Sequence, residues 1–201
     1  MKTLTCIFSF VLLSAASFTG KAQDVPAKLN EALAAWEAGQ LENARYALEE
    51  ALNGINHTIG KEILDLLPTS MGDMAMVAEE DDATGTSMGI AGLFVQRNYR
   101  NGEKNASVEI VSDSPLLSGI NTILSMPVIM QNDPNQKRIR LGNYKALMTR
   151  TTDDTGKVSW DIQMPFGSSL LTFRCSGIED EATVTGLANT LQVEKIVAAA
   201  Q

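Results

Sequence analysis

The sequence predicts an α+β fold, in which an N-terminal helical hairpin precedes a mainly antiparallel β-sheet of about six to seven strands, with helices packed on one face. Apolar residues recur every three or four positions before Pro68, and they alternate with polar residues after position 90. Short glycine-containing turns separate the alternating segments, and such connections favour antiparallel pairing. The apolar stripes of the helices would then cover the apolar face of the sheet.

Residues 1–22 have the pattern of a signal peptide. Lys2 precedes a run of apolar or small residues from Cys6 to Phe18, and Gly20-Lys21-Ala22 places small residues before a cleavage site. This run is shorter than the ~20 residues that a membrane-spanning helix needs. We therefore expect cleavage after Ala22 and a periplasmic or secreted protein with no transmembrane anchor.

Residues 23–67 read as a helical hairpin whose two helices are separated by Gly39-Gln40. Each helix carries an apolar stripe at helical spacing, and we expect these stripes to face the core. The first stripe comprises Leu29, Ala32, Leu33 and Trp36. The second comprises Leu41, Ala44, Leu48, Leu52, Ile55, Ile59, Ile63 and Leu66.

Residues 68–201 read as the sheet domain. Ser114 with Pro115 predicts a helix start, and a last helix is expected from Asp180. Asn101-Gly102 predicts a hairpin turn of type I′, in which both residues need a positive φ. The expected strands lie near residues 74–78, 93–100, 105–112, 137–141, 144–150, 157–164 and 169–175.

The composition excludes several classes of protein. The chain has 201 residues and a net charge of −8, without a cluster of basic residues. Nucleic-acid binding is not expected, because neutralising phosphates requires clustered cations. Once residues 1–22 are removed, Cys175 is the only cysteine, so the mature chain forms no internal disulfide.

Ser87 and His57 are the candidate residues for a hydrolase site. Gly85-Thr86-Ser87-Met88-Gly89 matches the G-x-S-x-G pattern of a nucleophile elbow, but the chain has no histidine beyond His57. The elbow also needs a strand before the serine, where this chain has an acidic loop. His57 is interpreted as a solvated side chain on a helix, because a general base needs a partner that orients it.

The sulfur-containing residues are candidates for a different kind of site, one that binds a metal ion. Met71, Met74 and Met76 could supply thioethers to Cu(I), which prefers soft ligands, or could simply fill a core. Cys175 shares a predicted strand face with apolar residues and is interpreted as packing. The acidic runs 79–82, 153–154 and 179–181 are interpreted as solvated turns or a helix start. We therefore assign no catalytic, cofactor-binding or metal-binding residue.

Four segments, in order, resemble a group of small exported bacterial proteins of unknown function. They are Ile63–Pro68, Gln96–Tyr99, Val108–Leu117 and Leu187–Leu191. The resemblance implies an organisation of sheet and helices loosely similar to PsbP-like domains. It implies no activity and no catalytic residues.

These observations predict a non-enzymatic binding module of the cell envelope without a cofactor. Its partner would be an envelope protein that contacts the exposed face of the sheet, the hairpin or the loop at residues 79–92. The alternative is a carrier of a small apolar ligand or lipid, held in a cavity between the sheet and the helices.

Overall fold

The computed structural model describes residues 24–84, 92–126 and 133–201, and it has the predicted α+β architecture. Segment 1–22 and Ser87 lie outside the described residues. The helices are α1 (Val25–Glu37), α2 (Leu41–Leu66), η1 (Ala78–Glu80, a 3-10 turn), α3 (Leu117–Ser125), α5 (Glu181–Ala188) and α6 (Val193–Ala199). The strands are β1 (Ser70–Met71), β2 (Met74–Met76), β3 (Phe94–Asn101), β4 (Lys104–Ser112), β5 (Gln136–Leu141), β6 (Tyr144–Thr152), β7 (Val158–Phe166) and β8 (Ser169–Ser176).

All eight strands form one antiparallel sheet in the order β1-β2-β3-β4-β8-β7-β6-β5. The predicted number of six to seven strands is therefore wrong by at least one. The strand that was missed is β1, whose two residues are too few to show an alternation. It is visible only through its pairing with β2, in which Met71 lies opposite Met74.

The two-residue hairpin loops place glycine first. In the turn between β3 and β4, Asn101 pairs with Lys104, so Gly102 and Glu103 form the loop, and only Gly102 has a positive φ (59°). This pattern fits a type II′ turn, so the predicted type I′ turn at Asn101-Gly102 is wrong. Gly142 and Gly167 occupy the same position in two further hairpins.

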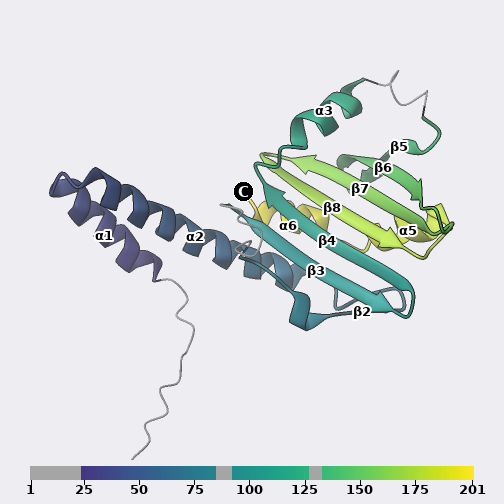
Figure 1. Ribbon diagram of the computed structural model, residues 1–201, viewed down its shortest axis with the longest axis horizontal. Coiled ribbons are helices and arrows are strands. Elements are labelled where there is room, and N and C mark those ends of the chain that lie inside the picture. Colours follow the sequence, from purple (N-terminus) through teal and green to yellow (C-terminus); the bar gives the residue numbers. More distant parts are fainter. Residues whose placement is uncertain (1–23, 85–91, 127–132) are drawn as a thin grey trace, which may run out of the picture.

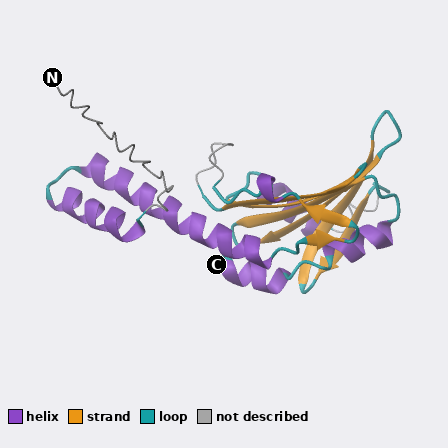
Figure 2. Ribbon diagram, turned by 90° about the horizontal axis from the view of Figure 1, so that it is seen from below, coloured by secondary structure: helices purple, strands orange, loops and turns teal. Residues whose placement is uncertain are grey.

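The main core lies between one face of the sheet, which we call the helix face, and the helices α2, α5 and α6. Figures 1 and 2 show these helices together on one side of the sheet. The last helix begins after Asp180, whose side chain accepts a hydrogen bond from Thr183 N at 2.8 Å. The single helix predicted there is wrong beyond Ala188, because α5 ends at that residue and α6 begins at Val193. The core includes Ile63, Val95, Tyr99, Val108, Ile110, Met148, Trp160, Ile162, Met164, Phe173, Val184 and Ile196.

One helix departs from the predicted arrangement. Ile120 and Leu124 of α3 pack on Leu147, which points away from the helix face because its neighbours Ala146 and Met148 point into the main core. The prediction that the helices cover one face is therefore wrong for α3.

The N-terminal hairpin extends beyond the sheet as a projecting arm, which we define as residues 25–55 (Figures 1 and 2). Its two helices meet through small residues, including Ala32 and Ala35 of α1 and Ala44, Ala47 and Ala51 of α2. Only the second half of α2 reaches the core, through Ile63. The prediction that both apolar stripes are buried is therefore wrong along the arm.

The second half of α2 sits very close to its neighbours. A Cβ added to Gly60 would lie 3.0 Å from the Cβ of Ala83 and 3.3 Å from the carbonyl oxygen of Phe94 in β3. A side chain at position 60 would therefore push these neighbours away by a few tenths of an ångström. Within the described residues, no helix is both long and apolar enough to cross a membrane.

Candidate functional site

The face of the sheet opposite α5 and α6, which we call the open face, is polar across five neighbouring strands at the end that α3 leaves uncovered. The alternation predicted for residues 157–164 is confirmed, since Val158, Trp160 and Ile162 are buried while Ser159 and Asp161 point to the other side. Register then aligns the polar positions of adjacent strands into rows across the sheet. One such row runs Asn98, Ser107, Arg174, Asp161 and Thr149.

A shallow cavity of about 380 Å³ lies over these rows. Its volume falls within the range of roughly 300–1,000 Å³ that small-ligand sites occupy. The polar side chains at the cavity are Asn98, Arg100, Asn105, Ser107, Thr149, Thr151, Ser159, Asp161, Arg174 and Ser176. Its lining therefore offers hydroxyl and amide groups around a few charges.

Three charged side chains form a chain across β4, β8 and β7. Arg174 Nη1 donates to Glu109 Oε2 at 3.2 Å, and Arg174 Nε lies 3.6 Å from Asp161 Oδ1. The second distance is an ion-pair distance, too long for a hydrogen bond. About half of the Arg174 side chain is exposed, so the guanidinium is available at the cavity.

Among these three charged side chains, the carboxylate of Asp161 has the unusual environment. Its Oδ1 is buried and has no hydrogen-bond donor among the residues that the structure describes. Burial raises the pKa of Asp161 above its ordinary value, and the nearby Arg174 only partly offsets that effect. A buried carboxylate oxygen without a donor is costly, and such groups are found at binding sites more often than elsewhere.

The alternation of residues 157–164 predicts a wet face here, but nothing in the sequence distinguishes Asp161 or Arg174 from the other polar residues of that face. These residues lie thirteen positions apart along a hairpin, and only the register Asp161↔Arg174 brings them opposite each other. The available signal was a pair of opposite charges at outward positions of two consecutive strands.

The residues weighed for hydrolysis are not brought together within the described residues. His57 lies on α2, away from the open-face cavity. It is half-buried, and its Nδ1 is buried with no hydrogen-bond partner in the described part of the chain. The prediction of a freely solvated histidine is therefore wrong.

The sulfur-containing residues pack in the core. Cys175 is 2% exposed on the helix face, and burial raises the pKa of its thiol to about 11. Met71 and Met74 are fully buried, and Met76 is partly buried against the same cluster. Fully buried thioethers among apolar side chains have the environment of core residues. The described ranges hold no group of three or more His, Cys, Asp or Glu side chains placed to bind a metal ion.

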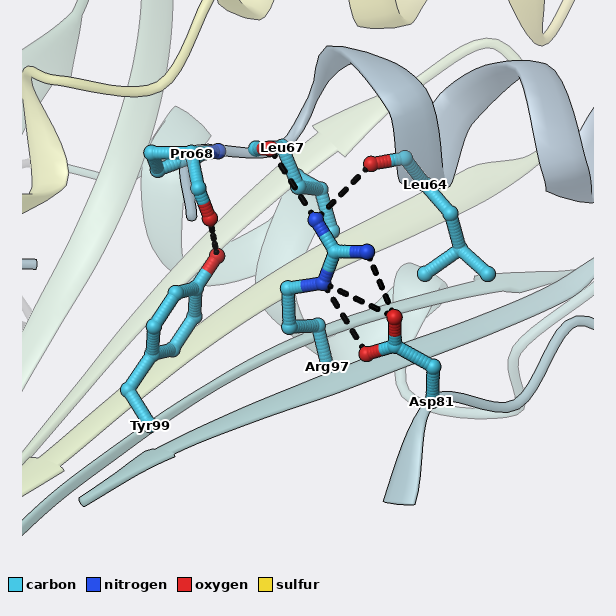
Figure 3. Close-up of polar contacts among 6 residues, drawn as sticks. All are labelled: Leu64, Leu67, Pro68, Asp81, Arg97 and Tyr99. Atoms are coloured by element: carbon cyan, nitrogen blue, oxygen red, sulfur yellow. Dashed lines mark hydrogen bonds and ion pairs between the residues drawn. The ribbon is translucent and has the colours of Figure 1, made fainter. Parts of the chain in front are cut away.

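The acidic run 79–82 is not a solvated turn, contrary to the prediction, because two of its carboxylates hold β3 from opposite faces. On the open face, Glu80 accepts from both Arg100 Nη atoms at 2.7 Å and from Asn98 Nδ2 at 2.9 Å. On the helix face, Asp81 accepts from Arg97 Nε at 2.9 Å (Figure 3). The turn predicted at residues 153–154 is confirmed, because Asp153 accepts a hydrogen bond from the backbone N–H of Thr155 at 2.9 Å.

Arg97 joins that carboxylate to the end of α2. Its Nη1 donates to the carbonyl oxygens of Leu64 at 2.9 Å and Leu67 at 3.0 Å (Figure 3). The last carbonyls of a helix lack partners and carry partial negative charge, so a buried guanidinium suits them. Tyr99 continues the contact by donating to the carbonyl oxygen of Pro68 at 2.9 Å, and burial raises its pKa to about 12.

Comparison of the chain with protein family models, with curated protein sequences and with solved structures finds no match. The resemblance to small exported proteins and to PsbP-like domains therefore stays a prediction.

Proposed function

We propose that this protein is a non-enzymatic, exported binding module of the cell envelope and that the open face of its sheet is the binding surface. The observation that carries the proposal is the cavity of about 380 Å³ with the buried Asp161 Oδ1 and the half-exposed Arg174 at its floor. The Asp161 side chain as a whole is 38% exposed, so its carboxylate can reach a ligand in the cavity while its Oδ1 still lacks a donor.

The chemistry of the cavity favours a polar segment of a partner protein as the ligand. Asp161 offers an acceptor and Arg174 offers donors, while Ser107, Ser159 and Thr149 offer hydroxyl groups that serve as either. A peptide backbone presents N–H and C=O groups in alternation, which this mixture can satisfy. Apart from Arg100 and Arg174 the polar lining side chains are short, and the cavity extends from β3 to β6, so an extended segment can lie across the strands.

Several features support binding over catalysis. A serine nucleophile needs a general base within hydrogen-bond reach, and imidazole is the commonest such group. His57 is the only histidine in the chain, and it lies on α2 rather than at the cavity. The one lining cysteine, Cys175, is buried with a raised pKa, which disfavours the reactive thiolate.

A site-directed photo-crosslinking experiment tests the proposal. A benzophenone amino acid replaces Ser159 at the cavity, and the control position is the exposed Ala182 of α5, behind the sheet. In the native host we expect cross-links to a defined protein segment from position 159 and none from position 182. Arg174→Met should abolish them.

Two outcomes would overturn the proposal. One is an equal cross-linking pattern from both positions, which would indicate non-specific contact. The other is the absence of cross-links together with a co-purified apolar molecule in native mass spectrometry, which would favour the alternative of a lipid carrier.

A further inference from the structure

The arm carries a surface that the open-face proposal does not use. Seven large apolar side chains project from α1 and the first half of α2 with 41–65% of their surface exposed. They are Leu29, Leu33 and Trp36 on α1, and Leu41, Leu48, Leu52 and Ile55 on α2. We call this set the arm stripe.

The arm stripe is one continuous surface. On α2 its residues recur at spacings of seven, four and three, and the same spacing continues into Ile59 and Ile63, which pack on the sheet. On each helix the exposed residues are displaced from the alanine seam by roughly a quarter turn in the same rotational sense. Because the two helices are antiparallel, both sets therefore lie on the same side of the hairpin.

The pattern matches a helix that has two neighbours. Each arm helix has one apolar strip of alanines, which is buried against the other helix, and an adjacent strip of large residues that stays 41–65% exposed. In a four-helix bundle each helix packs against two adjacent helices, which calls for this pair of strips. A two-helix arm supplies only half of such a bundle.

We propose that the arm stripe binds the arm stripe of a second copy of this chain, so that two hairpins form an antiparallel four-helix bundle. Taking about 200 Å² for each large residue, the size of an aromatic side chain, the exposed fractions leave on the order of 700 Å² of apolar surface per arm. A stable interface buries about 800 Å² per partner, so two arms come close to that requirement. The patch also exceeds the 300–600 Å² or so that is usual for the largest patch of a monomer.

The net negative charge of the hairpin favours a second copy of this chain, rather than an anionic membrane, as the partner of the arm stripe. Residues 25–66 hold three basic and seven acidic side chains, whereas helices that lie on membranes are rich in Lys and Arg on their polar face. The arm stripe itself holds no charged residue, so a two-fold interface does not place like charges against each other. Arg45 beside the stripe is paired with Glu49 of its own helix at 3.7 Å.

The antiparallel orientation of the two arms keeps the two sheets apart. Each sheet lies at the end of α2 remote from the tip at Gly39, so antiparallel arms place the two sheets at opposite ends (Figure 1). The exposed part of α2, from Leu41 to Ile55, is about 22 Å long, and its midpoint is Leu48. In this arrangement the two Leu48 side chains lie near the two-fold axis.

Sedimentation velocity of the chain from Gln23 to Gln201, between 1 and 100 µM, tests the proposal. We expect twice the monomer mass for the native chain and for Tyr46→Glu, which changes an exposed residue on the opposite side of α2. Leu48→Glu should be a monomer with an unchanged circular dichroism spectrum, because this side chain is exposed in the single chain. A native chain that stays monomeric at 100 µM would overturn the proposal.

Cross-linking of a cysteine variant tests the orientation. Leu48→Cys should form a disulfide-linked dimer under mild oxidation, whereas Tyr46→Cys should not, and the buried Cys175 does not interfere. Binding of the monomeric native chain to neutral phosphatidylcholine vesicles would instead assign the arm stripe to a membrane. Neither experiment depends on the open face, so this proposal can fail while the proposed function stands.

Discussion

Arg97 and Asp81 form a bidentate ion pair where the end of α2 meets strand β3. Both Nε and Nη2 of the guanidinium donate to the Asp81 carboxylate, while Nη1 serves the helix carbonyls of Leu64 and Leu67. The side chains are 9% and 17% exposed, so the pair is shielded from water. This contact joins the C-terminal end of α2 to strand β3 of the sheet.

Removing the guanidinium should destabilise the protein strongly. Arg97→Met leaves Asp81 without its cation and two helix carbonyls without donors, and breaking a buried pair costs about 3–5 kcal/mol. The control is Arg100→Met, whose half-exposed pair with Glu80 is worth about 1 kcal/mol or less. Urea unfolding measures both. Equal losses for the two variants would contradict the structural role of Arg97.

Asp161 and Asp153 should respond to removal of their charge in opposite directions. The raised pKa of Asp161 means that the folded protein holds this proton more tightly than the unfolded chain does, so stability is lost as the pH rises through that pKa. Asp161→Asn should therefore unfold at higher urea than the native chain at pH 7, and the gain should shrink below about pH 4.

Asp153 is the matched case with the opposite sign. The hydrogen bond from the Thr155 hydroxyl lowers the pKa of Asp153, so its ionised form stabilises the fold above the unfolded pKa, and this contribution is lost as the pH falls through the folded pKa. Asp153→Asn should lower the urea midpoint at pH 7. If Asp161→Asn also lowered it, burial of the Asp161 carboxylate would not be a net cost.

Two helical glycines should respond oppositely to alanine. Gly186 in α5 has no atom near an added Cβ, so Gly186→Ala should stabilise the protein by up to about 1 kcal/mol through helix propensity. Gly60→Ala should destabilise it, because the new Cβ meets Ala83 at 3.0 Å and the Phe94 carbonyl at 3.3 Å. Thermal unfolding distinguishes them. A stabilising Gly60→Ala would show that α2 is free to move away from the sheet.

Cys175 should resist thiol reagents in the folded protein. Burial raises the pKa of its thiol to about 11, so at pH 8 the thiolate is on the order of 100-fold scarcer than in the unfolded chain. Reaction with Ellman's reagent should be slow in buffer and fast in urea, in the chain from Gln23. The control is Cys175→Ser/Ser176→Cys, which moves the thiol by one residue to the open face and should react readily without urea.

The strands could be predicted because alternation records which face is buried. Residues 157–164 show this most clearly, and Cys175 was correctly assigned to the core on the same argument. The arm was harder to interpret, because a helical stripe indicates that a surface avoids water without indicating what covers it. Leu48 and Ile63 belong to one stripe, yet one is exposed and the other is buried.

The candidate site depended on relationships that local pattern does not contain. Asp161 and Arg174 face each other because of strand register, and Asp81 meets Arg97 because residues 78–82 pass along the edge of β3. Within an acidic run, no property of Asp81 separates it from its neighbours until the fold places a buried cation beside it.

The sequence by itself determined the α+β class, the strand faces and the helices, since periodicity and turn residues are local properties that act over a few positions. Tertiary structure alone decided which apolar stripe meets the core, which charges become partners and where a cavity opens. Those outcomes depend on distances between residues remote in the chain, such as Leu67 and Arg97, and these distances are set only when the sheet and α2 pack together.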